Sequence, residues 1–272
     1  MKHAKILSLF LAAMLLMLPL SALAEAPVDY QRVTDPYCPP GLQRMAQAAT
    51  TTDLITSDCW PYSAVACLDV EMACGCSYPG GTAFLVADDC LMTAGHMLVC
   101  LTHKQPVTRL RASFGYMEQD GEPSSYLYRY ETTDPKYWYN SRLLSGSYSS
   151  SLGWDYGCVR VPAEAGQTVG HFGLSVRSDD ELTDLPVEVV GYPSGTFDPL
   201  TGQTLRLDER TLRHSAPTIP GHSGSPVFDA SGYVVAVHNS HTVSGSDTTL
   251  WCTGARITQD IIDEMRSQGF FQ

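Results

Sequence analysis

Basic residues are scarce in this chain. Its 272 residues include 17 Lys and Arg against 29 Asp and Glu, which gives a formal net charge of −12 at pH 7. A surface with such an excess of acidic groups repels the phosphates of nucleic acids and the anionic headgroups of membranes. We therefore expect no nucleic acid among the partners of the protein, and no membrane around its folded part.

Long hydrophobic runs are also lacking, with one exception at the N-terminus. Lys2 and Lys5 precede an apolar run over residues 6–20, and Ala22-Leu23-Ala24 follows as a small-x-small cleavage site. This order is typical of a secretory signal peptide, so residues 1–24 are expected to be removed from a secreted, extracellular protein. A retained membrane anchor is the alternative, but the run is short for a span. Cleavage leaves 15 basic residues against 29 acidic ones, a formal charge of −14.

Helical periodicity is nearly absent. Only residues 258–268 show it, where Thr258 can cap a helix and Ile261, Ile262 and Met265 form an apolar stripe. From residue 61 onward, short apolar runs alternate with turn residues. Strands are expected at 63–70, 82–87, 90–94, 157–161, 186–192, 204–207, 211–216, 226–228, 233–238 and 249–257. Many short strands and one terminal helix predict an all-β fold with two antiparallel barrels.

Nine cysteines lie beyond the predicted signal peptide, at positions 38, 59, 67, 74, 76, 90, 100, 158 and 252. In an exported protein this number favours disulfides, and the odd count leaves at least one thiol without a partner in the same chain. Cys90 and Cys100 bracket His96 and can pin the loop that carries it, but the connectivity stays open.

A metal site is not expected. Cys74-Gly75-Cys76 lacks the usual two-residue gap of a zinc-ligand pair, and no pair of Cys or His completes it at a standard interval. His238 and His241 form another candidate pair, but they follow a predicted strand instead of lying on a helix. No cofactor motif occurs. The sequence therefore predicts neither a metal nor a cofactor, although it leaves a structural ion open.

Two sequence motifs contain candidate catalytic residues. Residues 221–227 read GHSGSPV, a loop that can present the Ser223 hydroxyl together with backbone N–H groups aimed at an oxygen that becomes negative. Alone, this motif also fits an ordinary hairpin loop. The second stretch is LMTAGH at 91–96, in which His96 stands 127 positions before Ser223, just past an apolar strand. Histidine suits the removal of a serine proton because its pKa lies near ambient pH.

Together the motifs resemble the chymotrypsin-fold serine peptidases, most closely their bacterial glutamyl endopeptidase branch. The matching stretches follow the family's order: TAGH at 93–96, WDYG at 154–157, GYP at 191–193, GHSGSPV at 221–227 and, more weakly, GARIT at 254–258. The resemblance implies two antiparallel six-stranded β-barrels and a C-terminal α-helix, with the active site between the barrels. It also implies a secreted serine endopeptidase, made as a zymogen, that acts as a monomer on polypeptides.

On this basis the chain divides into three parts. Residues 1–24 form the signal peptide, and residues 25–57, which are polar and contain several prolines, form a propeptide or flexible lead-in. The trypsin-like serine peptidase domain follows at 58–272. Within it we expect barrel one over about 58–165, barrel two over about 166–257 and the helix over 258–268.

The resemblance assigns the catalytic side chains. His96 is the general base, Asp155 orients the imidazole and stabilises its charged form, and Ser223 is the nucleophile. Ser223 is preferred to Ser225 because the Gly-x-Ser-Gly-Ser pattern of the family places the nucleophile first. The backbone N–H groups of Gly221 and Ser223 are expected to form the oxyanion hole.

The residues before Ser223 bear on specificity. Trypsin-like relatives that cleave after Arg or Lys have a carboxylate six positions before the nucleophile, where this chain has Pro217. Glutamyl endopeptidases instead have a threonine five positions before it and a histidine on the following strand, which match Thr218 and His238. A hydroxyl and an imidazole N–H can both donate to a carboxylate, so the resemblance implies cleavage after Glu, with Asp weaker. No role is predicted for three further histidines, His103, His171 and His214.

Two other functions remain open on the same fold. A catalytically silent homologue can serve as a binding or adhesion module, although the complete set of His96, Asp155 and Ser223 argues against it. An esterase or acyltransferase can use the same residues. Labelling with a fluorophosphonate probe separates the silent homologue from the enzymes, and cleavage of casein separates a peptidase from an esterase.

Overall fold

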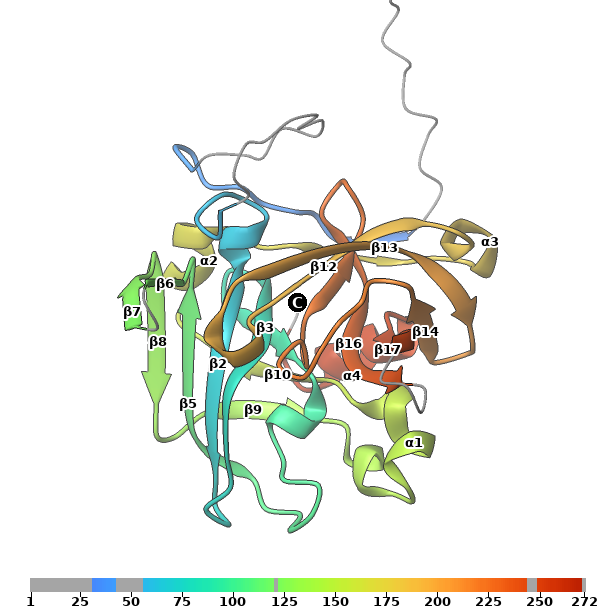
Figure 1. Ribbon diagram of the computed structural model, residues 1–272, viewed down its shortest axis with the longest axis horizontal. Helices are drawn as coiled ribbons and strands as arrows, with labels where there is room; N and C mark the ends of the chain where they lie inside the picture. The colour runs from blue at the N-terminus through green and yellow to red at the C-terminus, as the bar shows by residue number, and fades with distance from the viewer. Residues whose placement is uncertain (1–30, 43–55, 120–121, 244–248, 271–272) are drawn as a thin grey trace, which may run out of the picture.

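Two β-sheets lying against each other make up most of the protein (Figure 1). The computed structural model describes residues 31–42, 56–119, 122–243 and 249–270. The predicted signal peptide at 1–24 lies outside the described residues, as does the part of the lead-in at 43–55.

The C-terminal half forms a closed antiparallel barrel of six strands. The barrel closes because β16 pairs with both β15 and β17. Around the barrel the strands are β12 (Pro186–Gly191), β13 (Asp198–Leu207), β14 (Thr211–His214), β17 (Thr249–Arg256), β16 (Tyr233–Val243) and β15 (Pro226–Phe228). Successive side chains of a strand point to opposite faces. In β12 this alternation buries Val187 and Val189 and leaves Glu188 partly exposed between them.

The N-terminal half forms a curved sheet of seven strands. Across the sheet they are β8 (Tyr128–Thr132), β5 (Val107–Phe114), β2 (Val65–Met72), β3 (Ser77–Ala87), β4 (Cys90–Thr93), β10 (Gly157–Arg160) and β9 (Lys136–Tyr139). Among the described residues no strand pairing joins β8 to β9, so this sheet is an open half-barrel where the resemblance implies a closed one. The all-β, chymotrypsin-like fold is confirmed. A separate hairpin joins β6 (Met117–Gln119) to β7 (Glu122–Ser125).

The helices are short, apart from the last one. They are α1 (Tyr148–Ser151), α2 (Glu164–Val169), α3 (Asp179–Leu182) and α4 (Gln259–Ser267). The Thr258 side chain caps α4 by accepting from the N–H of Ile261 at 3.4 Å. Ile261, Ile262 and Met265 are fully buried, so the helix predicted from the apolar stripe is confirmed.

The lead-in contributes a strand of its own. β1 (Gln31–Thr34) pairs with β11 (Gly173–Val176), which in turn pairs in parallel with the first two residues of β16. The hydroxyl of Tyr233 donates to Asp35 at 2.6 Å and holds the same segment. Residues 31–34 of the predicted propeptide or flexible lead-in thus form a strand. Their side chains are mostly polar, and the backbone pairing with an existing sheet edge orders them.

The two sheets share one core. The rings of Phe84 on β3 and Phe172 lie 5.8 Å apart edge-on, and Phe172 lies 4.8 Å from Phe228 on β15. All three side chains are buried. Each buried side chain of this size contributes roughly 1.5–3 kcal/mol of transfer free energy, so this contact holds the halves in a fixed relation.

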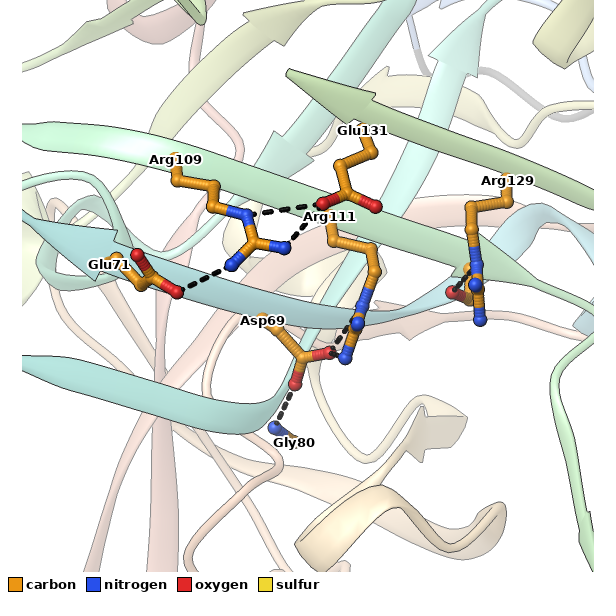
Figure 2. A network of polar contacts seen from close by, with 8 residues as sticks. Asp69, Glu71, Gly80, Arg109, Arg111, Arg129 and Glu131 are labelled. Carbon is orange, nitrogen blue, oxygen red and sulfur yellow. Dashed lines mark hydrogen bonds and ion pairs between the residues drawn. The ribbon is translucent and has the colours of Figure 1, made fainter. Parts of the chain in front are cut away.

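Ion pairs cross the outer face of the N-terminal sheet (Figure 2). Arg109 on β5 bonds Glu71 on β2 at 2.7 Å and Glu131 on β8, and Arg111 bonds Asp69 at 2.9 Å. Exposed pairs of this kind contribute at most about 1 kcal/mol each. Asp69 also accepts from the N–H of Gly80 at 2.9 Å. This bond fixes the β3 segment that is hydrogen-bonded to the loop of residues 219–225, here called the serine loop.

Candidate active site

His96 and Asp155 lie side by side at one end of two paired strands, β4 and β10. His96 lies in a 3₁₀ turn (Gly95–Met97) after β4, and Asp155 lies two residues before β10. Because Thr93 of β4 pairs with Gly157 of β10, the two residues are brought side by side. The Nδ1 atom of His96 lies 2.7 Å from Oδ2 of Asp155, and the backbone N–H of His96 donates to Oδ1 at 2.8 Å. The backbone bond holds the Asp155 carboxylate in place, and the contact with Nδ1 orients the imidazole.

A tyrosine that sequence reasoning missed completes the surroundings of Asp155. Asp155 is fully buried. The hydroxyl of Tyr148 on α1 donates to its Oδ2 atom at 2.8 Å and also lies 2.9 Å from the carbonyl oxygen of Asn239. No local pattern pointed to Tyr148, because it reaches Asp155 only through the fold of α1.

The pKa of His96 is raised above its ordinary value. Burial acts to lower this pKa, but the charge of Asp155 and the hydrogen bond to it act in the opposite direction and outweigh burial. An imidazole with this partner accepts a proton more readily than one in water. His96 therefore has the electrostatic setting of a general base.

The serine loop is hydrogen-bonded to both halves of the protein. The N–H of Thr82 on β3 donates to the carbonyl oxygen of Ser223 at 3.0 Å, and the N–H of Gly224 donates to that of His238 at 2.8 Å. Gly221 and Gly224 have φ values of 107° and 89°. Only glycine adopts this backbone without strain, which explains the two glycines of the motif.

Two backbone donors of the loop are available to a ligand. Among the described residues, no acceptor takes up the N–H of Gly221 or of Ser223. The hydroxyl of Thr82 donates to the Gly221 carbonyl oxygen at 2.9 Å and fixes the orientation of that peptide. Two such N–H groups are what an oxyanion hole requires.

One pocket of 330 Å³ brings these residues together. It lies between the two halves. His96 and Tyr148 line one side, and the serine loop and β16 line the other. Its lining consists of His96, Leu101, Tyr148, Ile219, Pro220, Gly221, Ser223, His238, Asn239, Ser240 and His241. The predicted base, nucleophile and specificity histidine thus face the same space. No carboxylate lines this pocket among the described residues.

His238 has a buried partner, His214, for which the sequence suggested no role. Nδ1 of His238 lies 3.2 Å from Nε2 of His214 on β14, and the two rings meet edge-on. Burial lowers the pKa of His214 to about 3 and that of His238 well below its ordinary value. Both rings are therefore neutral, and each offers one N–H and one acceptor nitrogen.

Thr218 and Ser225 are placed differently from Ser223. Thr218 is fully buried, does not line the pocket and donates its hydroxyl hydrogen to Cys252 Sγ at 3.0 Å. Ser225 is also fully buried, and its Oγ has no hydrogen-bond partner among the described residues. Of the two serines in the motif, Ser223 alone lines the pocket.

Two curated bacterial relatives are similar to this chain in sequence. An "Extracellular metalloprotease" of Bacillus subtilis is 26% identical over 223 residues, covering 79% of this chain and 66% of the relative. A "Glutamyl endopeptidase" of Bacillus licheniformis is 30% identical over 135 residues, covering 45% of this chain and 42% of the relative. The chain thus spans less than two thirds of either relative.

Similarity to solved structures supports the fold. A Glu endopeptidase in complex with MPD superposes with a TM-score of 0.62 at 20% identity, covering 79% of this chain and 94% of that one. The thermostable serine protease AL20 superposes with a TM-score of 0.59 at 12% identity, covering 77% and 98%. The sequence profile of the trypsin-like peptidase domain matches residues 81–237. The chain therefore belongs to the trypsin-like peptidase family and has the chymotrypsin fold.

Proposed function

We propose that the protein is a secreted serine endopeptidase that hydrolyses polypeptides, preferentially after Glu. The observation that carries the proposal is the orientation of His96 by Asp155, at 2.7 Å, on the wall of the pocket that Ser223 also lines. A histidine held by a buried carboxylate beside a serine is the arrangement that activates a hydroxyl for attack on a carbonyl.

The reaction then runs through an acyl-enzyme. His96 takes the proton of the Ser223 hydroxyl as Oγ bonds to the carbonyl carbon, and the negative oxygen accepts from the N–H groups of Gly221 and Ser223. His96 next gives its proton to the leaving amine as the C–N bond breaks. A water molecule, activated by His96 in the same way, hydrolyses the ester and restores Ser223.

The preference for Glu rests on His238. Its Nδ1 is engaged by Nε2 of His214. With the N–H of His214 donating to that Nδ1, His238 carries its own hydrogen on Nε2 and donates it to the substrate carboxylate. A cationic substrate residue finds no carboxylate among the described residues of this lining, which agrees with Pro217 at the position where Arg- and Lys-specific relatives have one.

Thr218 has a smaller part in this proposal. Thr218 directly precedes Ile219 and Pro220, which line the pocket, and its hydroxyl donates to Sγ of Cys252. We propose that Thr218 supports the pocket through this bond, and that His238 is the donor that meets the carboxylate.

Secretion rests on the N-terminal sequence and on one comparison. The Bacillus subtilis relative is named an extracellular protease. Within the described ranges, no helix is both long and apolar enough to span a bilayer. We propose that residues 1–24 direct export, and that the partners of the mature protein are polypeptide substrates.

Profiling of cleavage sites in a peptide library tests the function. The purified secreted enzyme is expected to cut after Glu, and more slowly after Asp, because the neutral His238 donates to a carboxylate. N-terminal sequencing of the same sample reports which residues have been removed. A profile dominated by Arg, Lys or large aromatic residues contradicts the specificity. Absence of peptide cleavage, together with turnover of ester substrates, contradicts the peptidase function itself.

The pH dependence of kcat/KM tests the role of His96. Catalysis needs the neutral imidazole, and its pKa lies above the ordinary value of 6.5, so activity falls as the pH drops through a midpoint above 6.5. Tyr148→Phe removes a donor to Asp155, leaves more negative charge facing His96 and moves that midpoint upward. Tyr137→Phe on β9, outside the pocket lining, leaves it unchanged. A midpoint below 6.5 in the unmodified enzyme, or no shift in Tyr148→Phe, contradicts the assignment.

A further inference from the structure

Four potential metal ligands converge at the end of the N-terminal sheet where β2 turns into β3 and where β5 begins. Cys74 and Cys76 lie in the turn between β2 and β3, and Cys100 and His103 lie in the loop between the His96 turn and β5. Their ligand atoms all lie within 4.8 Å of one another. All three cysteines are free thiols. The catalytic proposal uses none of these four side chains.

The spacing of the ligand atoms fits a tetrahedral zinc ion. With Zn–S near 2.3 Å and Zn–N near 2.0–2.1 Å, tetrahedral ligands lie about 3.8 Å apart for two sulfurs and about 3.6 Å apart for sulfur and nitrogen. Sγ of Cys100 lies 3.9 Å from Sγ of Cys76 and 3.4 Å from Nδ1 of His103. The Nδ1 atom of His103 lies 3.5 Å from Sγ of Cys76. Cys76, Cys100 and His103 thus lie close to ligand-to-ligand distances, and the ligand atom of Cys74 lies within 4.8 Å of each of them.

The backbone of the two loops is tied together around this cluster. The N–H of Ala73 donates to Pro106 at 2.8 Å, which joins one loop to the other, and the N–H of Cys100 donates to Gln105 at 2.8 Å. Gly75, between the first two thiols, has φ +83°, and no atom of the described residues lies within 4 Å of the position of a Cβ. The Tyr78 hydroxyl lies 3.7 Å from Sγ of Cys100. Such an outer partner orients a ligand.

We propose that Cys74, Cys76, Cys100 and His103 bind one structural Zn²⁺ ion. The three thiolates and one imidazole occupy all four tetrahedral positions. The ion therefore stabilises the fold and has no free coordination position for a substrate. Cys100 stands four residues after His96, and Leu101 lines the active-site pocket. The ion would therefore fix the loop that leads away from the catalytic histidine.

A disulfide is the competing use of the same thiols. It would join two of the three sulfurs and leave the third thiol and His103 without a function. The ligand pair Cys100–His103 does have the standard two-residue gap, but it is separated from Cys74 and Cys76 by 23 residues of sequence. Only the pairing of β2 with β3 and β5 brings the pairs together.

Zinc binding is measured on the full chain in a Ser223→Ala background, which removes self-cleavage and makes the result independent of the proposed function. The protein is reduced, loaded with Zn²⁺, dialysed and analysed for metal content by mass spectrometry. One zinc per chain is expected, and Co²⁺ in its place should give a thiolate-to-cobalt charge-transfer band. Cys76→Ser and His103→Ala are expected to weaken zinc binding at least about 100-fold, more than loss of an outer partner does.

Two control variants keep the test decisive. His103→Cys supplies a fourth thiolate and should retain one zinc, which separates loss of a ligand from loss of folding. Cys38→Ser removes a half-buried thiol outside the cluster and should also retain it. Unchanged zinc affinity in both Cys76→Ser and His103→Ala overturns the proposal. A disulfide at Cys100, found by peptide mapping of the secreted protein, overturns it as well.

Discussion

Replacement of Ser223 by Ala is expected to lower kcat by a factor on the order of 10⁶, as loss of the nucleophile does in another serine protease. The Ser223 hydroxyl is the group proposed to bond to the substrate carbonyl, and no other described residue of the serine loop brings a hydroxyl to the pocket lining. The side chain is small and only partly buried, so the melting temperature should change little. Hydrolysis of a Glu-containing peptide and thermal unfolding are measured on the same preparation.

Ser225→Ala is the matched control. Its Oγ is buried without a hydrogen-bond partner among the described residues. Removing such a group relieves the cost of its desolvation, so the variant should keep substantial activity and equal or greater stability. An equal loss of activity in the two variants, with both proteins folded, would overturn the choice of nucleophile.

His238→Ala is expected to abolish most of the preference for Glu while sparing general activity. A charge-assisted hydrogen bond contributes about 1.5–3 kcal/mol, so the ratio of kcat/KM for Glu and Gln peptides should fall by about 10- to 100-fold. The Gln peptide has nearly the same shape and no charge, so its kcat/KM should change much less. Steady-state kinetics on the two peptides gives this ratio directly.

Two further histidine variants sharpen this result. His214→Ala removes the partner that orients His238 through the 3.2 Å contact, so it should reduce the Glu preference to an intermediate degree. His171→Ala changes a histidine that bridges to Tyr37 in the lead-in, outside the pocket lining, and should leave the ratio unchanged. If His238→Ala lowers kcat/KM equally for the Glu and Gln peptides, His238 supports the fold of the pocket and does not recognise the substrate charge.

Much of the architecture was predictable because it depends on short-range patterns. The alternation in β12 and the stripe of α4 each arise from side chains a few residues apart, and both elements occur close to the predicted positions. The lead-in was harder to predict. β1 has a polar sequence, and it is ordered by the free edge that β11 offers, which local composition does not reveal.

The sequence by itself determined the family, the serine loop and the candidate residues His96, Asp155 and Ser223. These lie in short motifs whose glycines and flanking strands act over a few positions. The tertiary structure alone decided what those residues touch. It brings Tyr148 to Asp155, His214 to His238 and the Cys74–Cys76 turn to Cys100 and His103. Such contacts join residues far apart in the chain, and strand pairing and register, which no single segment encodes, determine which side chains meet.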